Sequence, residues 1–221
     1  MADDSAELPR WGRITEPTTV LTDVVLALLA FLFAVRLGHR SVVDDSAAGA
    51  WLAAGLLATG FASVIGAMAH ATDPARDGTF RERLWRGTLY ASGLIGAATV
   101  VSVAYFATRG RVRTVLLAFA VIKLVVFVRQ AARTPEFRVA AIDYGIALAI
   151  LVVGAVSEML RRGAPGMVWL IGGVLVSLVA GVVQARRLAF HRQFNHNDLY
   201  HVIQMVALYA FYRGGLLLVD R

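Results

Sequence analysis

The feature that most constrains this sequence is a series of seven apolar runs of about 20 residues, the length that a helix needs to cross the hydrocarbon core of a membrane. Short, arginine-rich connections separate the runs, which together occupy nearly the whole chain. We predict membrane spans over residues 18–37, 47–71, 87–107, 114–129, 139–160, 167–185 and 198–219. The predicted fold class is therefore all-α, a bundle of seven transmembrane helices.

The connections divide the chain in the same way. Pro74, Pro135 and Pro165 fall between predicted spans, where helix breakers are expected. Residues 1–17, with four acidic residues and two arginines, are predicted to be a cytoplasmic segment before one transmembrane domain of residues 18–221. Loops on the amino-terminal side hold more arginines than those on the other side, which places the amino terminus in the cytoplasm. We expect a protein of the bacterial inner (plasma) membrane.

Composition excludes several classes of protein. With 58% hydrophobic and 17% charged residues, the chain leaves no stretch for a soluble domain. The net charge of +7 is spread over the loops, so membrane lipids with anionic headgroups are the expected partners and nucleic acid is not. The chain has no cysteine, which excludes disulfides and thiolate ligands. Histidine, carboxylate and hydroxyl side chains must carry any chemistry.

Polar residues recur on one face of two predicted spans, because side chains four or seven positions apart share a face of a helix. These faces carry Thr59, Ser63, Gly66 and His70 in the second span, and Asn197, His201, Gln204 and Tyr212 in the seventh. An ionisable group in hydrocarbon costs about 2.5 to 3.5 kcal/mol, so such groups are expected to face a polar site inside the bundle.

The alternating direction of the spans predicts that these groups meet. The end of the second span and the start of the seventh lie on one side of the membrane, so His70 and His201 are predicted to share a depth. Asp23 and Asp143 enter near the same side, and Lys123 falls close to that level. Two neutral imidazoles and a carboxylate can hold zinc, whose bound water can attack an ester or amide.

Simpler interpretations of individual residues remain open. Asp198 can cap the last helix together with Asn195. His196 can be an interfacial or loop residue. Lys123 can reach the inner headgroups or pair with Asp143. His70, which closes its span, can likewise be an ordinary interfacial histidine.

The seven spans, the histidine that ends the second and the NDLYH stretch that opens the seventh resemble the alkaline ceramidase and progestin/adiponectin receptor superfamily of membrane hydrolases. Members carry Ser-x-x-x-His in the second span, an aspartate in the third and His-x-x-x-His in the seventh, with three histidines holding zinc near one membrane face. The chain also resembles an uncharacterised bacterial membrane protein family whose signature is the FNHNDLYH segment.

The resemblance rests on two histidines. His70 matches the second-span ligand, and His201 matches the final histidine of the seventh-span motif. The serine position is Gly66, the first histidine of the last motif is Asn197, and the third-span aspartate has no clear counterpart. The resemblance implies a zinc ion (Zn²⁺) held by His70 and His201, with Asp198 or His196 completing the ligand shell.

Two functions follow as hypotheses. The first is a zinc-dependent hydrolase of a lipid amide or ester, in which Asp143 or Asp23 orients a ligand or shuttles protons. The second is a metal-free transporter or sensor that responds to protons or ions. The remaining polar pocket residues are predicted to be Ser63, Asn197, Gln204, Tyr212 and Lys123. Haem and retinal proteins rank lower, the latter because the seventh span has no lysine for a Schiff base.

Overall fold

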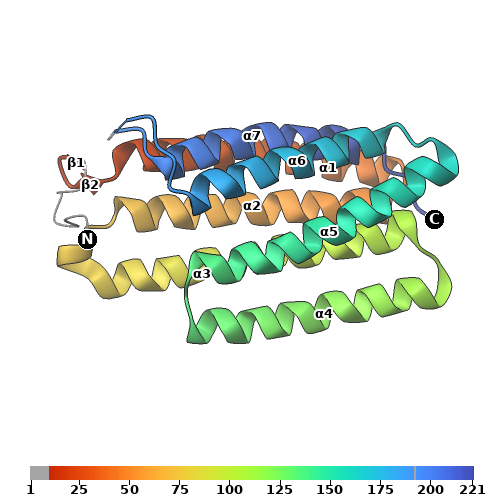
Figure 1. Cartoon of the computed structure of the whole chain (residues 1–221), viewed down its shortest axis with the longest axis horizontal. Coiled ribbons are helices and arrows are strands. Elements are labelled where there is room, and N and C mark those ends of the chain that lie inside the picture. The colour runs from red at the N-terminus through yellow and green to blue at the C-terminus, as the bar shows by residue number, and fades with distance from the viewer. Residues whose placement is uncertain (1–9, 192) are drawn as a thin grey trace.

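The computed structural model describes residues 10–191 and 193–221 of the chain. In these residues seven helices run side by side as an elongated bundle (Figure 1). They are α1 (Pro17–Val43), α2 (Ala47–Ala71), α3 (Pro74–Ala107), α4 (Gly110–Arg133), α5 (Phe137–Arg162), α6 (Gly166–Ala185) and α7 (His196–Gly215). A small antiparallel hairpin of β1 (Arg10–Trp11) and β2 (Ile14–Thr15) precedes them. The all-α prediction is confirmed except for this hairpin.

Six of the helices in the described part, α1 to α6, are long and apolar enough to cross a membrane. They indicate an integral membrane protein. The seventh predicted span corresponds to α7, which lies outside this group and has Asn197, Asp198 and His201 in its first turns.

Side chains next to the helix starts cap α7 and α2. α7 begins with a capping box, in which the Asn195 side chain accepts from the backbone of the first turn and Asp198 accepts from the Asn195 amide. Capping by these two residues is thus confirmed. At the far end, the Asp220 carboxylate accepts from the Ala47 and Ala48 amides, both at 2.9 Å, and so caps α2.

The third helix departs most from the predicted boundaries. The sequence predicted a span from residue 87, whereas α3 begins at Pro74 after the cap residue Asp73. Asp77 has non-helical backbone angles, so the first turn bends away from the rest of α3 (Figure 1). The charged stretch before residue 87 is therefore helical, and its side chains reach the adjacent end of the bundle.

The core lies between α1, α2, α3, α5, α6 and α7, while α4 is peripheral (Figure 1). Leu37, Leu151 and Leu170 are among the least exposed core residues. Helix α4 packs mainly against α3 and buries only Ala120, Lys123, Phe127 and Ala131, a single stripe at helical spacing. The other faces of α4 are rich in exposed valine and isoleucine.

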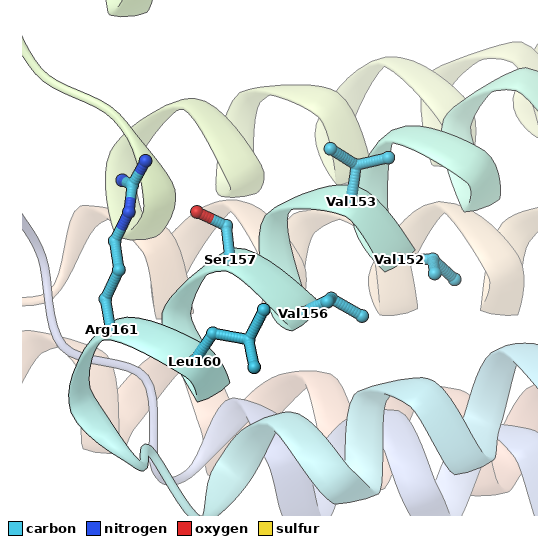
Figure 2. A pocket seen from close by; sticks show the side chains of 6 residues that line it. All are labelled: Val152, Val153, Val156, Ser157, Leu160 and Arg161. Atoms are coloured by element: carbon cyan, nitrogen blue, oxygen red, sulfur yellow. The ribbon is translucent and has the colours of Figure 1, made fainter.

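The outward face of α5 is also apolar. Its second half presents a shallow groove formed by Val152, Val153, Val156, Ser157, Leu160 and Arg161 (Figure 2). All six residues belong to one helix, so the groove is a helix face and not an internal cavity. Val153 is 71% exposed and Leu160 79%. A face of this kind suits contact with lipid chains, with Arg161 at the headgroup level.

Candidate functional site

A cavity of about 430 Å³ extends along the inside of the bundle, lined on α2 from His70 at the hairpin end to Leu52 near the opposite end. Its polar end is lined by Asp23 of α1, His70 of α2 and His201 of α7. Leucine and phenylalanine side chains, among them Leu52 and Phe211, line the deeper part. The predicted convergence of His70, His201 and Asp23 at one end of the bundle is confirmed. The volume lies in the range of small-molecule sites.

The cavity opens toward the outer surface between α5 and α6. Ala141 and Arg138 of α5 and Leu178 of α6 line the cavity and are also exposed, so they form its mouth. Gly145 and Gly181 line the same region, and a side chain at either position would meet no atom within 4 Å. The two helices join at one end of the bundle and draw apart toward the hairpin end (Figure 1).

The His201 imidazole lies between two neighbouring residues of α1. Its Nδ1 is 3.0 Å from Thr22 Oγ1, and its Nε2 is 3.4 Å from Asp23 Oδ1. His201 is 9% exposed and Asp23 3%. The second oxygen of Asp23 is buried and has no hydrogen-bond partner among the described residues. We call this contact the His201–Asp23 pair.

The hydrogen bonds of Thr22 indicate the tautomer of His201. The Thr22 hydroxyl lies 3.0 Å from the Thr19 carbonyl oxygen, which can only accept, so its one proton is assigned to that bond. The hydroxyl then accepts from His201 Nδ1–H, and a neutral ring presents the Nε2 lone pair to Asp23. Because two lone pairs repel, one proton has to lie between Nε2 and the carboxylate. Either Asp23 carries that proton or His201 is an imidazolium.

A glycine lets Asp23 reach this position. The Asp23 carboxyl lies over Gly66 of α2, where a Cβ would stand 3.3 Å from Oδ2. His70 follows Gly66 by one helical turn, about 5.4 Å along the axis. The predicted polar face of α2 is confirmed, because Thr59, Ser63, Gly66 and His70 all line the cavity.

His70 is held from the hairpin side. Its Nδ1 is 2.9 Å from Glu16 Oε2, and Arg81 Nη2 donates to Glu16 Oε1 at 2.7 Å. Burial alone would raise the pKa of Glu16, but the hydrogen bonds from His70 and Arg81 and the positive charge beside it hold that pKa below its ordinary value. Glu16 is thus ionised at neutral pH, so His70 donates through Nδ1–H. The neutral ring keeps a free Nε2.

The hairpin is fastened to the same end of the bundle. Thr15 Oγ1 donates to the carbonyl oxygens of His70 at 2.5 Å and Thr72 at 3.2 Å. Arg10 pairs with Asp73 at 2.8 Å. These contacts place Glu16, the residue directly before α1, over the end of α2.

The predicted polar face of α7 is confirmed for three of its four residues. Asn197, His201 and Gln204 line the cavity. Gln184 of α6 donates to Asn197 Oδ1 at 2.9 Å, and Ser177 of α6 donates to Gln204 Oε1 at 3.2 Å. Both hydrogen bonds join α6 to α7 along the cavity wall.

Three other predicted site residues have different surroundings. Tyr212 stacks on Phe33, with ring centroids 4.7 Å apart, and is not among the described residues that line the cavity. His196 is the first residue of α7 and is also outside the lining. Asp198 is fully buried, but its Oδ2 accepts from the Asn195 amide at 2.7 Å as part of the cap.

Asp143 and Lys123 pair with each other instead of joining the cavity residues. Asp143 Oδ2 and Lys123 Nζ are 2.6 Å apart, and both side chains are almost completely buried. They lie against Gly96 of α3, where a Cβ would stand 2.7 Å from each charged atom. Among the described residues, neither Asp143 nor Lys123 lines the cavity. The sequence-based alternative that the two residues pair is confirmed.

Comparison with known proteins gives a family for this chain. A model of a family of unknown function, DUF6962, matches residues 18–220. The chain belongs to this family. No curated protein and no solved structure matches it. The DUF6962 match covers α1 from its second residue through α7 and starts just after Glu16.

The donor groups at the cavity end of this DUF6962 chain are not gathered into one cluster of three in the described residues. Across residues 10–191 and 193–221, no group of three or more histidine, aspartate or glutamate side chains is placed to hold a metal ion. The His201–Asp23 pair supplies two donors, and His70 is engaged with Glu16. The side chains as arranged do not form a zinc ligand set.

Sequence reasoning missed Glu16, Thr22 and Arg81. Sequence alone assigns Glu16 to the amino-terminal segment and Arg81 to a charged entry before the third span. A signal for Glu16 does exist, because an acidic residue directly before Pro17 sits at a helix start and at the membrane boundary. Thr22 is adjacent to Asp23, and its hydroxyl is recognisable as a partner only once α7 is placed beside α1.

Proposed function

We propose that this protein is a proton-responsive membrane transporter or sensor that takes up an amphiphilic ligand from the bilayer and needs no metal. The observation that carries the proposal is the His201–Asp23 pair at the polar end of the cavity, where the His201 tautomer indicated by Thr22 requires one shared proton. A buried ionisable pair facing an internal cavity is typical of proton-coupled membrane proteins. In this proposal α7 is the seventh span, and the hairpin lies in the cytoplasm.

The shape and lining of the cavity favour an amphiphile. Its polar end can take a hydrogen-bonding headgroup, while its deeper apolar part can take a hydrocarbon tail. The mouth between α5 and α6 would face the bilayer from the side, so the ligand need not enter from water. Exposed Arg138 at this mouth favours a ligand with an anionic headgroup.

Proton and ligand are coupled in this proposal because they meet at one place. A headgroup beside the His201–Asp23 pair changes the free energy of the state in which the pair holds its proton. Linkage is reciprocal, so the proton must then change the affinity for the ligand by the same factor.

Binding of a pyrene-labelled alkyl sulfonate, whose headgroup stays anionic at every pH used, to the full chain in nanodiscs tests the proposal. With one linked proton, we expect the dissociation constant to change by about tenfold per pH unit across the titration of the pair. Combining Asp23→Asn with His201→Gln should remove the pH dependence. The matched control combines His39→Gln with Asp45→Asn, an exposed histidine and aspartate at the far end of α1 and in the loop that follows it. A pH dependence that persists in the cavity variant would refute the proposal.

A second candidate is a zinc-dependent hydrolase of a lipid amide or ester. One observation favours it: both His70 and His201 line the cavity and engage Nδ1 with a protein partner, as many histidine metal ligands engage one ring nitrogen. The described side chains do not form a three-donor group, so we assign no catalytic step to zinc.

Metal analysis of purified protein separates the two candidates. The proton-responsive proposal expects less than stoichiometric zinc after purification in zinc-supplemented medium, and no loss of pH-dependent binding on chelation. Stoichiometric zinc that disappears in His201→Ala, with hydrolysis of a lipid amide by the zinc-loaded protein, would instead favour the hydrolase.

A further inference from the structure

A line of ionisable groups leads from the hairpin surface to the cavity. Arg81 contacts Glu16 at 2.7 Å, and Glu16 contacts His70 Nδ1 at 2.9 Å. His70 lines the same end of the cavity as the His201–Asp23 pair. Asp23 lies against Gly66 of α2, and His70 follows Gly66 by one turn on the same face of that helix.

We propose that Glu16 and His70 form the proton route between the aqueous surface at the hairpin and the His201–Asp23 pair. This inference rests on the proposed function, because it requires that the pair bind and release a proton. It adds which side of the membrane supplies the proton and which residues carry it.

The proton balance for outward transfer is simple. His70 Nε2 accepts the proton that leaves Asp23, directly or through one water, and the ring becomes an imidazolium. The imidazolium then gives its Nδ1 proton to Glu16 Oε2, and Glu16 releases that proton to water at the hairpin surface. The neutral ring remains as the Nε2–H tautomer. Inward transfer is the reverse sequence, so no other reactant is needed.

Among the described residues, the printed contacts that lead from this end of the cavity to the hairpin run through His70 and Glu16. Asp23, His70 and His201 are the carboxylate and imidazole side chains that line the cavity. The other titratable or charged groups facing it or packed beside it are Glu16 before α1, Arg81 of α3, Arg138 and Tyr144 of α5, and Asp198 and Tyr200 of α7. Arginine does not release its proton near neutral pH.

Arg81 has a separate role in this route. Its side chain is 25% exposed, and its guanidinium contacts Glu16 Oε1, while Glu16 Oε2 contacts His70. Arg81 is therefore a positioning residue: it fixes the carboxylate and does not carry the proton. The hairpin supports the same geometry through Thr15, which bonds to the His70 carbonyl.

A pH jump on the full chain in liposomes tests the route. Time-resolved infrared spectroscopy follows the carboxyl band of Asp23, identified by its loss in Asp23→Asn. We expect Glu16→Gln and His70→Ala each to lower the rate at which this band changes after the pH jump by about a hundredfold, which is the size of effect that a positioned proton carrier has in catalysis. The final amplitude of the band should stay as in the wild type. Added imidazole should restore the rate in His70→Ala. Glu82→Gln, a change in an exposed surface pair, is the control and should have no effect.

The outcomes separate the route from the function on which it rests. Wild-type rates in both Glu16→Gln and His70→Ala would overturn the route and leave the proton-responsive pair intact. Slow rates in His70→Ala that imidazole does not restore, while Glu16→Gln is normal, would also overturn it. If the wild type shows neither a titrating carboxyl band that is lost in Asp23→Asn nor a titrating imidazolium band that is lost in His201→Gln, the proposed function itself fails.

Discussion

Replacing Asp143 by alanine is expected to lower the free energy of unfolding by about 3 to 5 kcal/mol, because the change leaves the Lys123 ammonium buried without a counter-charge. The two charged atoms are 2.6 Å apart, and the side chains are 5% and 7% exposed. Only a glycine at position 96 leaves them room, since a Cβ there would approach both to 2.7 Å. Chemical denaturation in detergent micelles, followed by circular dichroism, measures the change.

A double variant tests whether the uncompensated charge is the cause. Combining Lys123→Met with Asp143→Leu removes both charges and keeps apolar volume, so we expect stability within about 1.5 kcal/mol of the wild type. Glu82→Ala removes one partner of the exposed pair with Arg86 and should cost at most about 1 kcal/mol. Equal losses in Asp143→Ala and in the double variant would show that packing, and not charge, stabilises this contact.

Replacing Gly66 by valine is expected to remove the proton shared by His201 and Asp23. Even a Cβ at this position would stand 3.3 Å from Asp23 Oδ2, and the two methyl groups of valine must displace the carboxyl. Overpacking of this kind costs about 1 to 3 kcal/mol, so the protein should still fold while the pair is separated. The expected readouts are a shift in the frequency of the Asp23 carboxyl band and loss of the pH-dependent binding of the labelled alkyl sulfonate.

Two glycine variants define the specificity of that effect. A Cβ added at Gly172 of α6 would meet no atom within 4 Å, so Gly172→Val should leave both readouts unchanged. Gly66→Ala adds only the Cβ, and a shift of a few tenths of an ångström by Asp23 should preserve the pair. If Gly66→Val retains wild-type proton binding, the close approach of Asp23 to α2 is not required for the site.

Much of the bundle could be predicted from sequence, because membrane spans are encoded locally. Apolar length identifies α1 to α6, and prolines and caps mark where chain segments turn. Helical spacing also predicts the polar face of α2, and the alternation of spans predicts that His70, His201 and Asp23 meet at one end. Each of these features follows from repeats of a few residues or from the order of the helices.

The partners of individual groups could not be predicted in the same way. Whether Asp143 lies beside the histidines or beside Lys123 depends on how α3, α4 and α5 rotate about their axes, and helix order does not fix rotation. The sequence likewise left zinc and proton chemistry open, since both use the same residue types. The hydroxyl of Thr22 and the carboxylate of Glu16, which indicate the two histidine tautomers, come from positions that carry no motif.

Long apolar helices, and a gathering of polar groups toward one end of the bundle, could be predicted without coordinates, because hydrophobic length and helical period are properties of contiguous residues. The packing of the helices was needed to show that Asp23 lies beside His201, that Glu16 contacts His70, and that Lys123 pairs with Asp143. These pairings depend on distances of a few ångströms between residues as many as 178 positions apart, and on glycines whose missing side chains permit the approach.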